Sequence, residues 1–156
     1  MDNGAVTLYN GFTYWRTTMP IPRLSSAGLL PPGEHHATID EIVGAFPPIS
    51  AERQALNDAL RGTLIAFQAL KDAEPSSVIY IDGSYTTSKR DPVDIDVLVL
   101  SVLFDEDQII DLLDRTCPIE ATYLDIHVDR PETPALLTLF THTRRGTLKG
   151  IIVLDF

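Results

Sequence analysis

Two acidic residues open a stretch that is otherwise apolar, in the segment "DIDVLVL". Asp94 and Asp96 begin it, and the four residues after Asp96 are all Val or Leu. A run of this kind is typical of a strand that is buried on both faces. Because side chains alternate between the faces of a strand, Asp94 and Asp96 project to the same side. Two neighbouring carboxylates repel each other unless a cation lies between them.

A divalent cation and a solvated strand end are the two explanations for this pair. Mg²⁺ takes oxygen ligands and often binds through one or two carboxylates together with substrate phosphates. Alternatively, Asp94 and Asp96 are solvated acids at a strand start that follows a loop closed by Pro92. Two further features favour the cation.

The first feature is a turn, and the second is a third acid. Gly83 and Ser84 directly follow the predicted strand "SVIYID", where a glycine lets backbone approach closely and a hydroxyl can hold phosphate oxygens. Asp125 lies inside the alternating "TYLDIHV", where an acid between apolar residues should be paired or bound to metal. We therefore expect one site to which three strands contribute.

A strand, a Gly-Ser pair, a short spacer, an Asp-x-Asp pair and a later strand acid together resemble the nucleotidyltransferase superfamily. The resemblance implies the polymerase β-like fold. It also implies that Asp94 and Asp96 hold two Mg²⁺ ions, and that Asp125 binds one ion and helps to deprotonate the acceptor. Gly83 and Ser84 would bind the β- and γ-phosphates of a nucleoside triphosphate. This core spans residues 50–130.

The chain also resembles small bacterial proteins of the DUF6932 kind. This resemblance rests on "LLPPGEHHATIDEI", "YIDGSYTTSKRDPVDIDVLVL" and the terminal "KGIIVL". By similarity to minimal transferases linked to toxin-antitoxin and phage-defence systems, the expected reaction moves AMP from ATP to a hydroxyl of a protein, an RNA or a small molecule. The C-terminal helical domain of larger relatives is missing, so we expect a protein partner or a second copy to complete the acceptor site.

Two other functions use the same residues. A catalytically weak nucleotidyltransferase fold would serve as an antitoxin or regulatory subunit, and the acidic surface would suit a basic protein partner. A metal-dependent phosphoesterase would use the carboxylates but explains Gly83 and Ser84 less well.

Four more residues near these motifs have predicted roles. Lys89 and Arg90 lie in the loop before Asp94, where a cation meets a triphosphate or stays solvated. Asp82, just before Gly83, either reaches the metal or, as we expect, stabilises the strand-end turn or caps a helix. His127 shares the strand face of Asp125 and is either a partner of that carboxylate or a surface residue.

The order of predicted elements indicates an α/β (α+β) domain around one mixed sheet with flanking helices. Proline-rich residues 1–37 are predicted to form an extended arm, and residues 38–156 the domain. Thr38 and Glu41 have the spacing of a capping box at a helix start. Ser50 is the predicted N-cap of one long helix that ends near residue 73, and a further helix is expected between 105 and 115.

The composition of the chain limits the kinds of partner and the cellular location that we expect. The formal charge is −10, from 22 acids and 12 bases, which disfavours extended nucleic acid as a partner. A single cysteine excludes an internal disulfide. An acid near the N-terminus and the lack of a long apolar run predict a cytoplasmic protein without a membrane partner.

Overall fold

The computed structural model describes the backbone of residues 5–9 and 12–15, and residues 21–156 with their side chains. The first two stretches form an antiparallel pair, β1 (Ala5–Tyr9) and β2 (Phe12–Trp15). The other residues of the predicted arm before residue 21 lie outside the described part of the chain.

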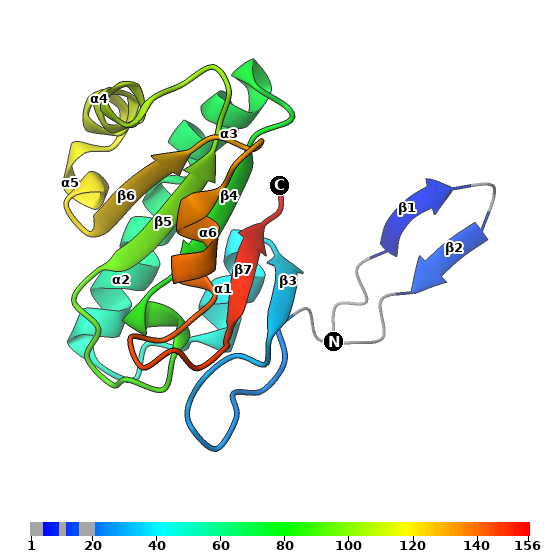
Figure 1. Cartoon of the computed structure of the whole chain (residues 1–156), viewed down its shortest axis with the longest axis vertical. Helices are drawn as coiled ribbons and strands as arrows, with labels where there is room; N and C mark the ends of the chain where they lie inside the picture. Colours follow the sequence, from blue (N-terminus) through cyan, green and yellow to red (C-terminus); the bar gives the residue numbers. More distant parts are fainter. Residues whose placement is uncertain (1–4, 10–11, 16–20) are drawn as a thin grey trace.

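A five-stranded mixed sheet with flanking helices forms the centre of the described structure (Figure 1). Its strands lie in the order β3-β7-β4-β5-β6, with parallel pairs at both edges and antiparallel pairs between them. The predicted mixed α+β architecture is therefore confirmed. The strands are β3 (Gly33–Ala37), β4 (Val78–Asp82), β5 (Ile95–Leu100), β6 (Leu124–Asp129) and β7 (Gly150–Leu154).

The edge strand β3 corrects the predicted domain boundary at residue 37. Gly33–Ala37 pairs in parallel with β7, so these residues belong to the sheet and not to an extended arm. Their sequence, "GEHHA", has no apolar alternation that would indicate a strand. Only the pairing with β7, more than a hundred residues away, makes this segment a strand.

The three helices predicted from Thr38, from Ser50 and between residues 105 and 115 lie at the expected positions, with one difference. The single helix predicted from Ser50 to residue 73 is two helices, which meet at Thr63 after the poor helix former Gly62. Capping boxes begin α1 at Thr38 and α4 at Asp105. The helical elements are α1 (Ile39–Ala45), α2 (Ala51–Gly62), α3 (Leu64–Ala73), the 3₁₀ turn η1 (Ser84–Thr86), α4 (Glu106–Thr116), α5 (Pro118–Ala121) and α6 (Ala135–Phe140).

The two faces of the sheet are covered unequally. One face packs against α1, α2, α3 and α4 and forms the larger apolar core, to which β4 contributes Ile79 and Ile81. On the opposite face, Tyr80 and Leu98 belong to a smaller cluster that packs against Leu136 and Phe140 of α6. Figure 1 shows α6 crossing this second face, where it is the only helix among the residues that the structure describes. The end of the face beyond α6 is left free for polar side chains.

None of the helices in the described ranges is long and apolar enough to cross a membrane.

A buried hydrogen bond ties η1 to the helical layer. The Tyr85 hydroxyl donates to Asn57 Oδ1 at 2.7 Å, and Asn57 Nδ2 donates to the carbonyl of Phe46 at 3.0 Å. Tyr85 and Asn57 are 0% and 1% exposed, so water cannot take the place of either partner in this hydrogen bond. Burial also raises the pKa of the Tyr85 hydroxyl, which therefore stays a donor.

We expect Tyr85→Phe to lower the free energy of unfolding by about 1–3 kcal/mol, because Asn57 Oδ1 would stay buried without a donor. Urea denaturation measures this change. Tyr123→Phe, at a half-buried position outside this bond, is the matched control and should change the free energy by less than about 0.5 kcal/mol. Equal effects of the two substitutions would contradict a stabilising role for the hydrogen bond between Tyr85 and Asn57.

Candidate functional site: a row of carboxylates beside a glycine turn

Strand register places three carboxylates in one row across the sheet. Asp82 at the end of β4 lies opposite Asp96 of β5, and Asp96 lies opposite Asp125 of β6. Residues that face each other on neighbouring strands project to the same side. The row lies on the face covered by α6, since Asp82 follows Tyr80, and Asp96 precedes Leu98, by two residues.

Gly83 allows the turn after β4 to approach this row. Its φ of +84° lies in a region that residues with a Cβ rarely adopt. A Cβ built on Gly83 would lie 2.2 Å from Asp96 Oδ2. The turn therefore requires glycine both for its conformation and for its distance from the Asp96 carboxylate, while phosphate binding by Gly83 stays a prediction.

Arg53 of α2 holds the loop that follows this turn. Its guanidinium donates to the carbonyl oxygens of Tyr85 at 2.9 Å, Thr87 at 2.7 Å and Lys89 at 3.1 Å. Arg53 is 3% exposed, and burial lowers the pKa of its guanidinium, which nevertheless stays charged. A charged group with three backbone acceptors fixes the loop, so Ser84 and Lys89 are presented from a rigid support.

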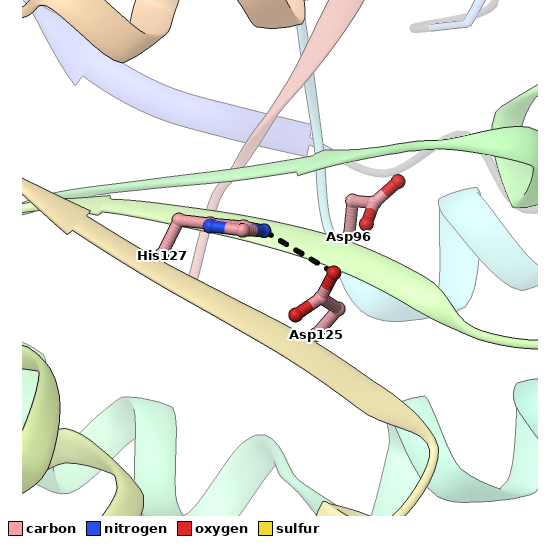
Figure 2. A group of neighbouring side chains, drawn as sticks. All are labelled: Asp96, Asp125 and His127. Atoms are coloured by element: carbon pink, nitrogen blue, oxygen red, sulfur yellow. Dashed lines mark ion pairs between the residues drawn. The ribbon is translucent and has the colours of Figure 1, made fainter.

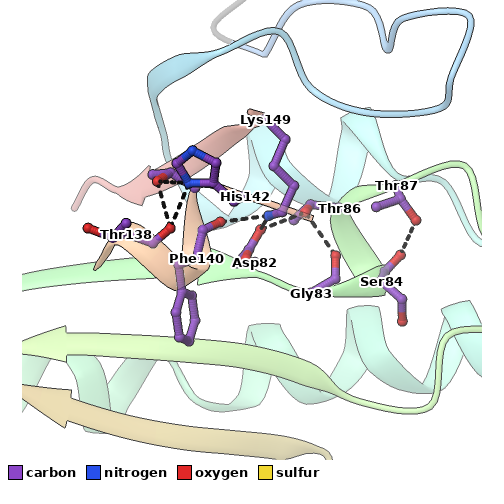
Figure 3. A network of polar contacts seen from close by, with 10 residues as sticks. Asp82, Gly83, Ser84, Thr86, Thr87, Thr138, Phe140, His142 and Lys149 are labelled. Atoms are coloured by element: carbon purple, nitrogen blue, oxygen red, sulfur yellow. Dashed lines mark hydrogen bonds and ion pairs between the residues drawn. The ribbon is translucent and has the colours of Figure 1, made fainter. Parts of the chain in front are cut away.

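An ion pair occupies one end of the row, as Figure 3 shows. Lys149 Nζ, from the residue before β7, contacts Asp82 Oδ1 and donates to the carbonyl of Phe140 at 2.8 Å. Both ionic side chains are nearly enclosed, at 11% exposed for Lys149 and 6% for Asp82. Burial raises the pKa of Asp82, while the Lys149 ammonium opposes this shift. Besides its expected role in the turn, Asp82 therefore forms an ion pair with Lys149, the residue before the last strand.

These groups line a single cavity of about 620 Å³. The volume lies within the range of small-molecule sites. Carboxylates gather along the sheet, while the cations come from the loops around it, so charges of both signs face the same space. The lining consists of Asp82, Gly83, Ser84, Lys89, Val93, Asp94, Asp96, Asp125, His127, Leu139, Phe140, His142, Thr143, Arg144 and Lys149.

The structure brings six of the seven predicted site residues to this cavity. The exception is Arg90, whose guanidinium lies 3.8 Å from the Asp91 carboxylate on the exposed loop. The neighbouring Lys89 does line the cavity. The six residues at the cavity are Gly83, Ser84, Lys89, Asp94, Asp96 and Asp125.

Sequence reasoning missed the wall that the last part of the chain contributes. Phe140 of α6, together with His142 and Arg144 of the following loop, lines the same cavity as the predicted motifs. The position of Lys149 in the sequence could have indicated a site residue. It directly precedes the apolar "GIIVL", just as Asp96 directly precedes the apolar "VLVL". No local pattern indicates that α6 and the loop after it contribute to this cavity.

Proximity to other carboxylates changes the acidity of Asp96. Burial, together with the negative charges of Asp94, Asp125 and Asp82, raises the pKa of Asp96 to about 6. The folded protein therefore holds these acids together at a cost that a bound cation would remove.

Three side chains of the site can share one metal ion. Asp96, Asp125 and His127 each offer a ligand atom, and these atoms lie within 4.8 Å of one another. Figure 2 shows the His127 imidazole pointing toward the carboxylates, with Nε2 3.3 Å from Asp125 Oδ2. Asp94 lines the same cavity but does not belong to this group. The oxygen donors, their mutual repulsion and the glycine that leaves room beside Asp96 all fit a divalent cation.

The fold and the site together define a mixed α+β protein with a carboxylate-lined cavity on the thinly covered face of its sheet. Residues 22–155 match a sequence profile of DUF6932, a family of unknown function, and the chain belongs to this family. No curated protein and no solved structure matches the chain. The resemblance to DUF6932 proteins is therefore confirmed, whereas membership of the nucleotidyltransferase superfamily stays a prediction.

We expect Lys149→Met to lower the free energy of unfolding by about 3–5 kcal/mol, because Asp82 would be buried without its cation. Urea denaturation of this variant and of Asp82→Asn/Lys149→Met measures the effect, and the double variant should recover part of the loss. Arg90→Met removes a cation from the exposed pair with Asp91 and should cost less than about 1 kcal/mol. A loss in Lys149→Met as small as in this control would contradict the buried pair.

From the raised pKa of Asp96 we expect the stability of the protein to depend on pH when a chelator removes divalent ions. Its pKa rises from 3.8 in the unfolded chain to about 6 in the folded protein, so the folded state binds more protons between these values. The free energy of unfolding should therefore fall as the pH rises through this window.

Asp96→Asn should flatten that dependence and stabilise the protein above pH 6 by on the order of 1 kcal/mol, since Asp96 is only partly shielded from solvent. Urea denaturation between pH 5 and 8 measures both effects. Parallel curves for wild type and variant would show that Asp96 does not titrate in this range.

Proposed function

We propose that this protein is a divalent-metal-dependent nucleotidyltransferase, which transfers a nucleoside monophosphate from a nucleoside triphosphate to a hydroxyl group. AMP from ATP is the expected group, and a protein, an RNA or a small molecule is the acceptor. The observation that carries the proposal is the row of carboxylates from adjacent strands beside the Gly83–Ser84 turn, within one cavity.

Asp94, Asp96 and Asp125 would hold the metal, as two Mg²⁺ ions in the proposed site. When bound, divalent ions neutralise phosphate charge and stabilise the attacking and leaving oxygens of an in-line displacement. The proximity of these three carboxylates supports the proposal, because the charges of Asp94 and Asp125 oppose the ionisation of Asp96.

The protein's own groups have distinct parts in the proposed reaction. Ser84 and Lys89, on the loop that Arg53 fixes, would bind the outer phosphates of the triphosphate. Arg144, from the opposite wall, adds a cation to the same space. Binding of this kind positions the α-phosphorus for attack, and positioning accounts for a large share of the acceleration in phosphoryl chemistry.

The proposed transfer step forms one bond and breaks one. The acceptor oxygen bonds to the α-phosphorus, the bond from that phosphorus to the bridging oxygen breaks, and pyrophosphate leaves. The Asp125 carboxylate, which is 54% exposed and lines the cavity, would take the hydroxyl proton. The step releases one pyrophosphate for each nucleoside monophosphate transferred.

The experiment that tests the proposal incubates the purified protein with each nucleoside triphosphate, labelled at the α-phosphate, with Mg²⁺ or Mn²⁺ and a cell extract as source of acceptors. Pyrophosphate release and label in protein, RNA or small molecules are measured. We expect Asp96→Asn to lower the transfer rate at least about 100-fold, because the metal loses a charged ligand. Circular dichroism checks that the variant is folded.

Asp91→Asn is the matched control, since Asp91 is an acid of the neighbouring exposed loop and should leave the rate unchanged. Full transfer by Asp96→Asn would exclude the mechanism. Release of inorganic phosphate alone would favour a phosphoesterase. A stoichiometric protein partner with no turnover of any nucleotide would favour a regulatory binding subunit.

A further inference from the structure

We propose that His127 is a direct metal ligand, and that with Asp96 and Asp125 it forms a mixed nitrogen and oxygen site that prefers a transition-metal divalent ion, such as Mn²⁺, over Mg²⁺. This inference names the ligand set and the class of metal for the proposed function. It rests on the proposed function for the role of the bound ion. A site built from carboxylates alone would have no such preference.

The fold places the three ligands independently of any ion. Asp96 and Asp125 face each other across the parallel pair of β5 and β6. His127 follows Asp125 by two residues, so the strand itself directs both side chains to the same face. Their ligand atoms lie within 4.8 Å of one another, close to the largest separation of about 4.4 Å for two ligands of one ion.

A ring contact orients the imidazole of His127. The Phe140 ring of α6 meets it edge to face, with ring centroids 5.5 Å apart and planes at 74°. Nε2 is then the nitrogen directed at Asp125, at 3.3 Å (Figure 2). An aromatic pair of this geometry is favourable beyond its buried area, so α6 restricts the rotation of the ring.

A simple surface ion pair is the alternative explanation for the His127 contact. The side chains of His127 and Asp125 are 36% and 54% exposed, and pairs as exposed as this contribute little to stability. Such a pair does not account for a third ligand atom from Asp96 at the same place. The half-exposed position instead gives ions access to the site from solvent.

The ligand types determine the preference. Carboxylate oxygens suit Mg²⁺ and Mn²⁺ alike, whereas imidazole favours first-row transition metals. Exchanging one oxygen ligand for His127 therefore raises the affinity for Mn²⁺ relative to Mg²⁺. Asp94, outside this group but in the same cavity, stays available for a second ion or for the waters of the first.

The test measures metal binding to the full-length protein without nucleotide. Electron spin echo spectroscopy of bound Mn²⁺ detects a coordinated imidazole nitrogen directly, and it requires no variant. Calorimetric titration with Mn²⁺ and with Mg²⁺ gives the ratio of their affinities. We expect nitrogen modulation in the wild type and tighter binding of Mn²⁺.

His127→Gln should abolish the nitrogen modulation and lower the ratio of Mn²⁺ to Mg²⁺ affinity at least about 10-fold. His142→Gln is the matched control. His142 lines the same cavity, but its Nδ1 lies 2.8 Å from the Thr138 carbonyl and it is outside the ligand group, so both readouts should stay as in the wild type.

Bound Mn²⁺ without nitrogen modulation, an unchanged affinity ratio in His127→Gln, or no binding of Mn²⁺ would each overturn the inference. Its failure is distinct from failure of the proposed function. Nitrogen modulation without nucleotidyl transfer would leave the metal site standing and remove the transferase. Transfer without nitrogen modulation would leave the transferase standing and remove His127 from the ligands.

Discussion

Repulsion between carboxylates that the sheet holds in register is the constraint on which the site depends. The pairing of β4 with β5 and of β5 with β6 brings Asp82, Asp96 and Asp125 to one level, and no rotation of a strand can separate them. Lys149 neutralises one end of the row through its ion pair with Asp82. Toward the other end, burial and the neighbouring acids both make ionisation of Asp96 unfavourable, and a cation would relieve this cost.

Because the two faces of the sheet are covered unequally, the fold can hold a row of carboxylates and stay stable. The face toward α1–α4 carries the larger apolar cluster, so most of the stabilising burial does not involve the acids. The short helix α6 covers only part of the opposite face, where it packs on Tyr80 and Leu98. Beyond α6, the polar row opens into the cavity instead of into a core that would have to exclude it.

Local charge and global charge differ in this protein. A net charge of −10 argues against a broad phosphate-binding surface, yet Lys89, Arg144 and Lys149 meet at one cavity. Rigid supports bring them there, since Arg53 fixes the loop of Lys89 and the Phe140 carbonyl anchors Lys149. Such an enclosed mixture of charges suits a small phosphate ligand with its own cations better than a long polyanion.

The sequence by itself determined the parts of the structure that local patterns encode. Alternation set the shared face of Asp94 and Asp96, and the capping boxes at Thr38 and Asp105 set two helix starts, because these signals act over a few residues. Only the tertiary structure decided the strand role of Gly33–Ala37, the register of the acid row and the partner of Asp82. Each of these depends on a contact between distant segments, such as the 67 residues that separate Asp82 from Lys149, for which no short pattern exists.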